Sequence, residues 1–274
     1  MKSNKFIKLL SAPYIVWAVG FIIIPLIMVF YYGLSNRDKQ FTFEYVLSIA
    51  KPEHFKSLYL ALLLALVSTI VCILLAYPLA LILSGLKSKN EHLVVFIFIL
   101  PMWMNFLLRT YAWMTLLENN GVINSILNFL HLPNIQIINT PAAIVFGMVY
   151  NFLPFMILPL YNSINKIDKN VLNAARDLGA NYFQTLVRVI IPLSVPGIIS
   201  GITMVFVPSL TTFVVSEMLG GGKILLIGNV IEQEFTQNSN WYQGSGLSIV
   251  LMLFIIISMV ITNIYDKEGE GNTL

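Results

Sequence analysis

The sequence predicts an all-α integral membrane protein with six transmembrane helices. Two observations lead to this prediction. Apolar residues make up 57% of the 274-residue chain and charged residues only 11%, whereas roughly a quarter of the residues in soluble proteins are charged. Apolar stretches of about 20 residues, the length that crosses a bilayer, lie at Pro13 to Tyr32, Ser57 to Leu86, Leu93 to Leu117, Pro141 to Tyr161, Pro192 to Ser216 and Leu247 to Tyr265.

The first apolar stretch is predicted to be a retained helix and not a cleaved signal peptide. Lysines precede it, as they precede the apolar region of a signal peptide, but the stretch is too long for such a region and contains Pro13 and Pro25. The polar residues Ser35 to Asp38 follow it, without the small-residue pattern of a cleavage site. We therefore expect this segment to remain in the membrane.

The spacing of the apolar stretches predicts how the chain is organised. A polar segment separates the first helix from the others, and most later connections are short. We expect a peripheral helix and outer loop over residues 1–56, a five-helix core over residues 57–265 and a short cytoplasmic tail over residues 266–274. In the outer segment 118–140, the apolar run Val122 to Leu130 is predicted to form a short interfacial helix.

Basic residues in the loops predict the orientation, because translocated loops tend to lack them. With the amino terminus in the cytoplasm, the inner side holds Lys2, Lys5, Lys8, Lys87, Lys89, Lys166, Lys169, Arg176, Arg188 and Lys267. The outer side then holds half as many, namely Arg37, Lys39, Lys51, Lys56 and Lys223. This orientation places the loop at residues 162–191 in the cytoplasm.

The 162–191 loop contains a polar-faced helix. Apolar side chains recur at three- and four-residue spacing from Val171 to Ile190, and charged and amide side chains occupy the opposite face. Gly179 interrupts the pattern near its middle, where we expect a bend between two short helices. We expect the apolar face to pack under the membrane domain and the charged face to remain in the cytosol, which describes a docking loop for a soluble partner.

The same loop resembles a signature of binding-protein-dependent ABC import permeases. That family carries Glu-Ala-Ala, then Gly four residues on, then an apolar-x-apolar-Pro group after nine more. Asn173 stands where the family has Glu. The resemblance implies a type I ABC importer permease (MetI-like) fold and an ATPase-coupling loop with Asn173, Ala174, Ala175, Asp177, Gly179, Val189, Ile191 and Pro192 as its candidate residues.

Four further stretches resemble the permeases of spermidine/putrescine importers. They lie at Leu100 to Asn105, Arg109 to Trp113, Pro159 to Asp168 and Ser216 to Ile231. This resemblance implies one half of a polyamine pathway in a bacterial cell membrane. The implied partners are two copies of an ABC ATPase subunit, a second permease of the PotC type and an extracytoplasmic polyamine-binding protein, with the lipid bilayer around them.

Carboxylates and aromatic rings gather at the predicted outer ends of the spans, a combination that suits an organic cation. Glu217 precedes Gly220 to Gly222, a predicted mobile turn beside the pathway, and Trp241 and Tyr242 follow across a short outer loop. For each residue the alternative interpretation is an aromatic belt with solvated acids. The candidate pathway residues are Glu217, Trp241, Tyr242, Trp103, Tyr111, Trp113 and Glu118.

No enzyme active site, cofactor site or metal site is predicted. Gly220 to Lys223 superficially suggests a phosphate loop but lacks the required glycine six positions before the lysine. His54, His92 and His131 sit on separate loops, so the sequence supports neither metal binding nor a catalytic triad. The scattered basic residues are explained by membrane topology, so no nucleic-acid partner is expected.

Two alternative functions stay open. The same architecture could import another small organic cation or a phosphonate. A different class, an ion-coupled secondary transporter, would normally need carboxylates at the bilayer midplane or inverted repeats, and the sequence displays neither. Arg109 is the only charge well inside a predicted span, and we expect it to reach the interface or to pair with another helix.

Overall fold

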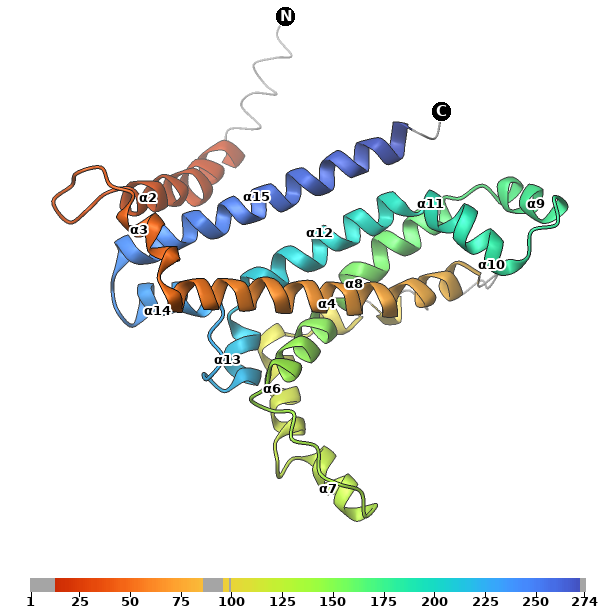
Figure 1. The fold of residues 1–274 in the computed structure, drawn as a ribbon, viewed down its shortest axis with the longest axis horizontal. Coiled ribbons are helices and arrows are strands. Elements are labelled where there is room, and N and C mark those ends of the chain that lie inside the picture. The colour runs from red at the N-terminus through yellow and green to blue at the C-terminus, as the bar shows by residue number, and fades with distance from the viewer. Residues whose placement is uncertain (1–12, 86–95, 99, 272–274) are drawn as a thin grey trace, which may run out of the picture. The chain divides into compact units, whose positions relative to one another are not determined.

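The computed structural model describes residues 13–85, 96–98 and 100–271, with side chains through residue 262 and at residue 264. Throughout these ranges the regular structure is helical, apart from one isolated bridge between Ser35 and Phe41. The all-α prediction is therefore confirmed (Figure 1). Residues Lys2, Lys5, Lys8, Lys87, Lys89 and His92 lie outside the described residues.

The chain divides into two compact units. Unit 1 contains the described residues of Met1–Lys56 together with Val230–Phe254, and unit 2 contains those of Ser57–Asn229 and Ile255–Leu274. Three helices have residues in both units, namely α4 (Pro52–Gly85), α14 (Ile227–Thr236) and α15 (Trp241–Gly271). The division of the chain predicted at residues 56 and 265 stays a prediction.

Unit 1 joins the first helix to residues near the start of α15. Gly33 permits the close approach, since a Cβ atom there would lie 2.6 Å from Cδ1 of Ile249. Tyr242 packs between Tyr32 and Tyr45, at ring-centroid distances of 5.4 and 5.7 Å. The elements of this unit are η1 (Val19–Ile23), α2 (Ile24–Gly33), α3 (Glu44–Leu47), η2 (Ser48–Ala50), the start of α4 (Pro52–Gly85) and parts of α14 (Ile227–Thr236) and α15 (Trp241–Gly271).

Unit 2 is built on the packing of α8 against α12 (Figure 1). Gly197 lets the two helices approach closely, because a Cβ atom there would lie 2.7 Å from the carbonyl oxygen of Pro159. The elements of this unit are most of α4 (Pro52–Gly85), η3 (Leu100–Trp103), α6 (Phe106–Leu117), α7 (Val122–Phe129), α8 (Pro141–Asn165), α9 (Lys169–Asp177), α10 (Tyr182–Thr185), η4 (Leu186–Ile190), α11 (Ile191–Leu193), α12 (Val195–Thr211), α13 (Val214–Gly220) and the remainder of α14 and α15.

Four described helices are long and apolar enough to cross a membrane, and one bent pair would add a fifth. The number six stays a prediction, because the predicted span at Leu93 to Leu117 begins outside the described residues. Its described part consists of the helical residues 96–98, of η3 and of α6, and Met104 and Asn105 separate η3 from α6. The four helices are Pro13–Gly33, Pro52–Gly85, Pro141–Asn165 and Trp241–Thr262, and the bent pair is Tyr182–Leu193 with Val195–Thr211.

The span predicted from Pro192 to Ser216 differs from the structure at both ends. At its start the chain bends by 64° between Leu193 and Val195. Pro196 explains the break, because it has no N–H to continue the hydrogen bonding of the preceding turn. At its end α12 stops at Thr211, the backbone of Thr212 is extended with ψ 131°, and the chain resumes as α13.

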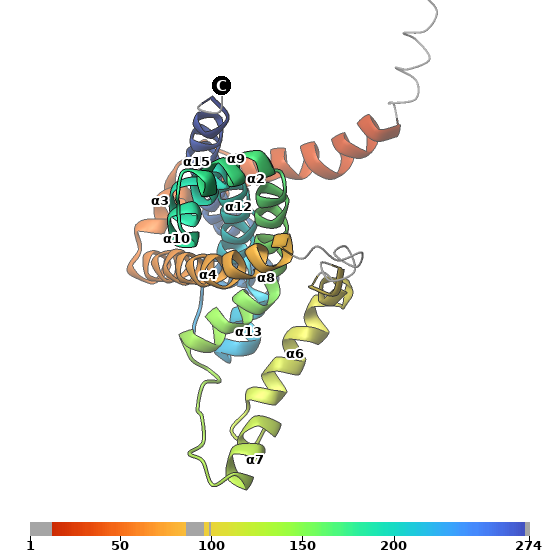
Figure 2. The same ribbon diagram turned by 90° about the vertical axis from the view of Figure 1, so that its right-hand side faces the viewer.

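The short helix predicted from Val122 to Leu130 is confirmed as α7, and an amide holds its return segment in place. The Asn124 side chain is buried; its Nδ2 donates to the carbonyl oxygens of Glu118 and Ile135, and its Oδ1 accepts from the backbone N–H of Ile135. The chain then returns from α7 to α8 along a non-helical segment (Figure 2). The interfacial position of α7 stays a prediction.

Candidate functional site

The 162–191 loop owes its shape to local signals in the sequence. Asp168 caps α9, since its Oδ1 accepts from the backbone N–H of Asn170 at 2.9 Å. Asn181 and Gln184 form a reciprocal capping box at α10. Such caps satisfy backbone N–H groups that the first turn of a helix leaves unpaired. The loop is thus a defined pair of short helices.

Gly179 connects these helices in a left-handed conformation, with φ +82°. No heavy atom outside its own neighbourhood lies within 4 Å of a Cβ atom built at this position. The glycine is therefore required by backbone conformation and not by lack of space. The predicted bend between two short helices is confirmed.

The apolar residues on either side of the Gly179 turn are largely exposed in this chain, which corrects the expectation that the whole apolar face packs under the membrane domain; Leu172, Ala175, Leu186 and Ile190 are half-buried. Leu178 is 89% exposed, Tyr182 71% and Phe183 70%. The physical reason is the turn at Gly179, which interrupts the helical repeat, so the apolar residues of α9 and α10 do not form one continuous stripe. An apolar surface of this kind is available to a partner.

The candidate residues of the loop divide by exposure. Asn173, Ala174, Asp177 and Pro192 are exposed, whereas Ala175, Val189 and Ile191 are half-buried. The Asn173 side chain makes no hydrogen bond to another described residue. Val189 lies in the π-helical turn η4, which ends two residues before Pro192. Pro192 has no N–H for the carbonyl four residues earlier, which accounts for the irregular turn.

A second region combines three of the predicted pathway residues. It is a pocket of about 600 Å³, here called the two-carboxylate pocket, between the end of α6, the segment before α8 and α13. Glu118, Glu217 and Tyr111 contribute two carboxyl groups and one aromatic ring, and none of the lining residues is basic. The lining residues are Tyr111, Met114, Glu118, Asn119, Asn120, Ile138, Asn139, Glu217, Met218 and Gly221.

Glu217 is held by an amide that the sequence analysis did not single out. Nδ2 of Asn229 lies 3.0 Å from Oε2 of Glu217 and 3.1 Å from the carbonyl oxygen of Phe213. Asn229 is fully buried, whereas Glu217 is exposed. The only sequence signal for Asn229 was its place in the stretch from Ser216 to Ile231, which gave it no role.

Backbone conformation explains why glycines follow Glu217, and at Gly221 lack of space is a second reason. Gly221 and Gly222 have φ +61° and +67°. A Cβ atom on Gly221 would collide with Oδ1 of Asn139, and the backbone N–H of Asn139 donates to the carbonyl oxygen of Leu219 at 2.9 Å. The turn is thus tied to the segment before α8, and its mobility stays a prediction.

The other predicted pathway residues do not line this pocket. Trp113 packs between α6 and α8 against Phe146 and Tyr150, at 4.7 and 5.1 Å between ring centroids. Trp103 is exposed and meets Phe96 edge-on at 5.4 Å.

Trp241 and Tyr242 belong to unit 1, where they line a pocket of about 350 Å³ together with Arg37. Their predicted proximity to Glu217 stays a prediction. The guanidinium group of Arg37 makes their own pocket a poor place for a cation.

Arg109 pairs with a neighbouring helix, which is one of the two outcomes expected from the sequence. It is only 7% exposed, and its Nη1 donates to the carbonyl oxygen of Pro101 at 2.6 Å. Its guanidinium carbon lies 5.7 Å from the ring centroid of Tyr150 on α8. Arg109 therefore stabilises the packing of α6 on α8.

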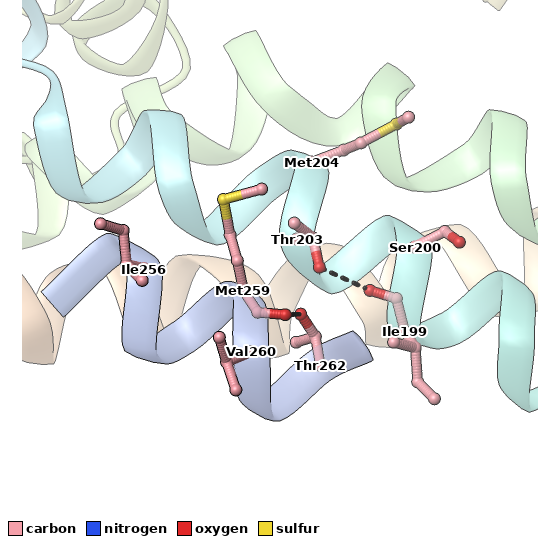
Figure 3. Close-up of a pocket in the computed structure, with 8 residues that line it drawn as sticks. All are labelled: Ile199, Ser200, Thr203, Met204, Ile256, Met259, Val260 and Thr262. Carbon is pink, nitrogen blue, oxygen red and sulfur yellow. Dashed lines mark hydrogen bonds between the residues drawn. The ribbon is translucent and has the colours of Figure 1, made fainter. Parts of the chain in front are cut away.

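A pocket of about 510 Å³ between α12 and the unit 2 part of α15 differs in chemistry from the two-carboxylate pocket (Figure 3). The hydroxyl of Thr203 donates to the carbonyl of Ile199 at 3.1 Å, and that of Thr262 to the carbonyl of Met259 at 3.0 Å. Both hydroxyls are thus satisfied within their own helices. The pocket offers mostly apolar surface and no charge to an ammonium group.

The family model for "Binding-protein-dependent transport system inner membrane component" matches residues 66–268. The chain is 40% identical over 281 residues to a spermidine/putrescine transport system permease protein of Haemophilus influenzae, covering 98% of both chains. It is 39% identical over 266 residues to the protein of that name from Escherichia coli K12, covering 93% of this chain and 97% of the relative.

Among solved structures, a bacterial ABC transporter that imports the acidic polysaccharide alginate has a similar chain. The TM-score is 0.80 at 17% identity, covering 100% of this chain and 98% of that one. A chain of the MetNI methionine ABC transporter gives a TM-score of 0.58 at 16% identity, covering 80% and 99%. At these identities the likeness concerns the fold, which agrees with the predicted MetI-like fold.

Proposed function

Because the chain belongs to the family of binding-protein-dependent transport system inner membrane components, we propose that it forms half of the membrane pathway of an ATP-driven importer for polyamines such as spermidine and putrescine. The family consists of permease subunits, which are not themselves enzymes. The observation that carries the proposal is 40% identity over 98% of both chains to a spermidine/putrescine permease.

The two-carboxylate pocket supports the choice of cargo. A polyamine carries several ammonium groups joined by methylene chains, so its site needs carboxylates for the charges and aromatic or apolar surface for the chain between them. Glu118, Glu217, Tyr111 and Met114 supply these groups. A phosphonate would meet two carboxylates and no basic lining residue, which makes an anionic cargo the poorer fit.

The 162–191 loop supports coupling to a separate ATPase. Its exposed apolar residues and its left-handed bend give a protruding surface of fixed shape. We propose that this loop docks on an ABC ATPase subunit, of which the complex holds two copies, and that a PotC-type permease provides the other half of the pathway. An extracytoplasmic polyamine-binding protein delivers the cargo.

The proposed arrangement also fixes the orientation in a bacterial cell membrane. The amino terminus and the 162–191 loop lie in the cytoplasm, where ATP is present, and the two-carboxylate pocket lies toward the outside. The excess of basic residues in the predicted inner loops supports this orientation.

The proposal is tested by purifying the chain with its associated proteins in mild detergent and reconstituting the complex in liposomes. We expect an ATPase, a second permease and a binding protein to copurify. We expect uptake of radiolabelled spermidine or putrescine to require ATP, and choline and methylphosphonate to serve as unrelated cargo controls.

Two results would contradict the proposal. An active complex that hydrolyses ATP but takes up neither polyamine would remove the cargo assignment. Uptake driven by an ion gradient without ATP would instead support the secondary-transporter alternative.

A further inference from the structure

Asn229 joins Glu217 to the buried interior of unit 2. We infer that Asn229 is a positioning residue, whose amide holds the Glu217 carboxylate in the orientation in which it meets an ammonium group of the cargo. The inference rests on the proposed function, because it assumes that Glu217 contacts a cationic cargo. It assigns a role to a residue that itself touches no cargo.

The surroundings of Asn229 determine which way its amide points. On one side, its Oδ1 accepts from the backbone N–H of Leu226 at 3.2 Å and from the hydroxyl of Ser216. On the other side, its Nδ2 donates to the carbonyl oxygen of Phe213 and to Oε2 of Glu217. Since a backbone N–H can only donate and a backbone carbonyl can only accept, the opposite orientation of the amide would lose both backbone bonds.

Asn229 is anchored more firmly than Glu217, and this difference indicates which of the two residues positions the other. The Asn229 side chain is fully buried, and two of its partners are backbone groups. Glu217 is exposed and lines the two-carboxylate pocket. The fold therefore keeps the Asn229 amide in place, whereas the Glu217 side chain can rotate unless the amide holds it. Asn229 thus restricts Glu217 and not the reverse.

A neutral donor is the appropriate partner for a carboxylate that must bind a cation. Lys or Arg in place of Asn229 would compensate the carboxylate charge and repel an approaching ammonium group. An amide N–H fixes Oε2 of Glu217 by a hydrogen bond and leaves the full negative charge on the carboxylate, with Oε1 free of the Asn229 contact. This arrangement pre-organises the charge toward the pocket.

The test uses the reconstituted complex and the KM for spermidine. Asn229→Asp keeps the size of the side chain and its acceptor toward Leu226 but replaces the group that donates to Glu217 and to the carbonyl oxygen of Phe213 with an oxygen. We expect KM to rise about fivefold, the equivalent of losing the hydrogen bond to Glu217, while the complex still assembles. Asn229→Ala is the second variant, because it removes the donor without adding a charge, and we expect a similar rise.

The decisive comparison is made in the Glu217→Gln background. If Asn229 acts through the carboxylate, Asn229→Asp and Asn229→Ala will not raise KM further once that carboxylate is gone. Ser216→Ala is the matched structural control, because it removes a bond to Oδ1 of Asn229 and leaves the bond to Glu217. We expect its KM to equal that of the unmodified complex.

Several outcomes would overturn the inference while leaving the proposed function intact. These are an unchanged KM in both Asn229 variants, equal rises with and without the Glu217 carboxylate, or a KM rise in Ser216→Ala as large as in the Asn229 variants. Failure of both Asn229 variants to assemble, while Ser216→Ala assembles, would assign Asn229 to the fold alone. Absence of polyamine uptake by the unmodified complex would instead contradict the proposed function.

Discussion

The 162–191 loop and the two-carboxylate pocket are built in different ways. In the loop, the hydrogen bonds that define the shape join near neighbours, such as Asp168 with Asn170 and Asn181 with Gln184. In the pocket, they join separate elements, as between Asn139 and Leu219. A locally determined loop can present its apolar side chains outward to a partner, whereas a pocket for a small cargo needs charges held by the surrounding fold.

The two glycine turns sharpen this comparison. Gly179 and Gly221 both have positive φ, but the space around Gly179 is open and that around Gly221 is filled by Asn139. Substitutions at these two positions therefore separate conformational strain from steric collision.

The largest effect is expected at Gly179. Leucine at a left-handed position costs about 1–2 kcal/mol, and the loop is expected to relieve this strain by changing its bend. We predict that Gly179→Leu leaves the chain inserted but uncouples ATP hydrolysis from uptake, so that uptake falls at least about tenfold.

Asparagine provides the control at this position, because it tolerates the left-handed region and its Cβ atom would have no neighbouring atom within 4 Å. Gly179→Asn should keep most of the uptake. Normal uptake by a well-expressed Gly179→Leu complex would show that the bend has no part in coupling.

Substitution by asparagine should destabilise the protein at Gly221 but not at Gly179. Gly221→Asn satisfies the backbone but forces a Cβ atom into the side chain of Asn139, and overpacking of this kind costs about 1–3 kcal/mol. We predict a lower melting temperature of the detergent-purified complex for Gly221→Asn than for Gly179→Asn. Equal melting temperatures would contradict the described packing of Asn139 against the turn.

The exposed apolar residues of the loop should matter for assembly and not for the stability of the chain. Phe183 is largely exposed, so removing its ring loses little packing within this protein. At an interface, truncation of an anchoring aromatic side chain costs more than about 1 kcal/mol. We predict that Phe183→Ser weakens association with the ATPase about tenfold, measured by copurification at graded ATPase concentrations, without lowering the yield of inserted chain. A similar loss of inserted chain would indicate a folding role.

The smallest effect is expected at Asn173. Its side chain is exposed and makes no hydrogen bond to another described residue, so changes there should act only through a partner. We predict that Asn173→Glu is tolerated and that Asn173→Leu reduces assembly with the ATPase by an amount equivalent to about 1 kcal/mol. Equal assembly and transport of the Leu variant and the unmodified chain would exclude this position from the contact.

The contrast between local and distant contacts explains what could be predicted from the sequence. Proline, glycine and apolar spacing act over a few residues, and they predicted the helix start at Pro141, the bend at Gly179 and the short helix from Val122. The break of the fifth span after Thr211 was missed, because Thr212 and Phe213 are apolar enough to continue a membrane helix. Composition predicts crossing length but not where a helix stops within it.

The candidate site was predicted in part for the same reason. Residue type alone was enough to select carboxylates and aromatic residues as candidates. Three of these candidates, Glu118, Glu217 and Tyr111, line one pocket. Trp113 could not be told apart from them, although it packs between α6 and α8. Asn229 was missed because its proposed role depends on four hydrogen-bond partners that only folding brings together. The exposure of Leu178, Tyr182 and Phe183 was missed because periodicity alone does not identify what covers an apolar face.

The central claim is that the loop and the pocket perform separate tasks in one importer, and Glu217→Gln compared with Phe183→Ser tests it most directly. Both variants are measured in reconstituted complexes for spermidine uptake over a range of concentrations, for basal ATP hydrolysis and for the amount of bound ATPase. Glu217→Gln should raise the KM for spermidine by an amount equivalent to about 1–3 kcal/mol, while assembly and basal ATP hydrolysis are retained. Phe183→Ser should instead reduce the amount of bound ATPase and leave KM unchanged in the complexes that remain. Unchanged uptake of spermidine and putrescine by Glu217→Gln, or a KM change in Phe183→Ser equal to that of Glu217→Gln, would contradict the claim.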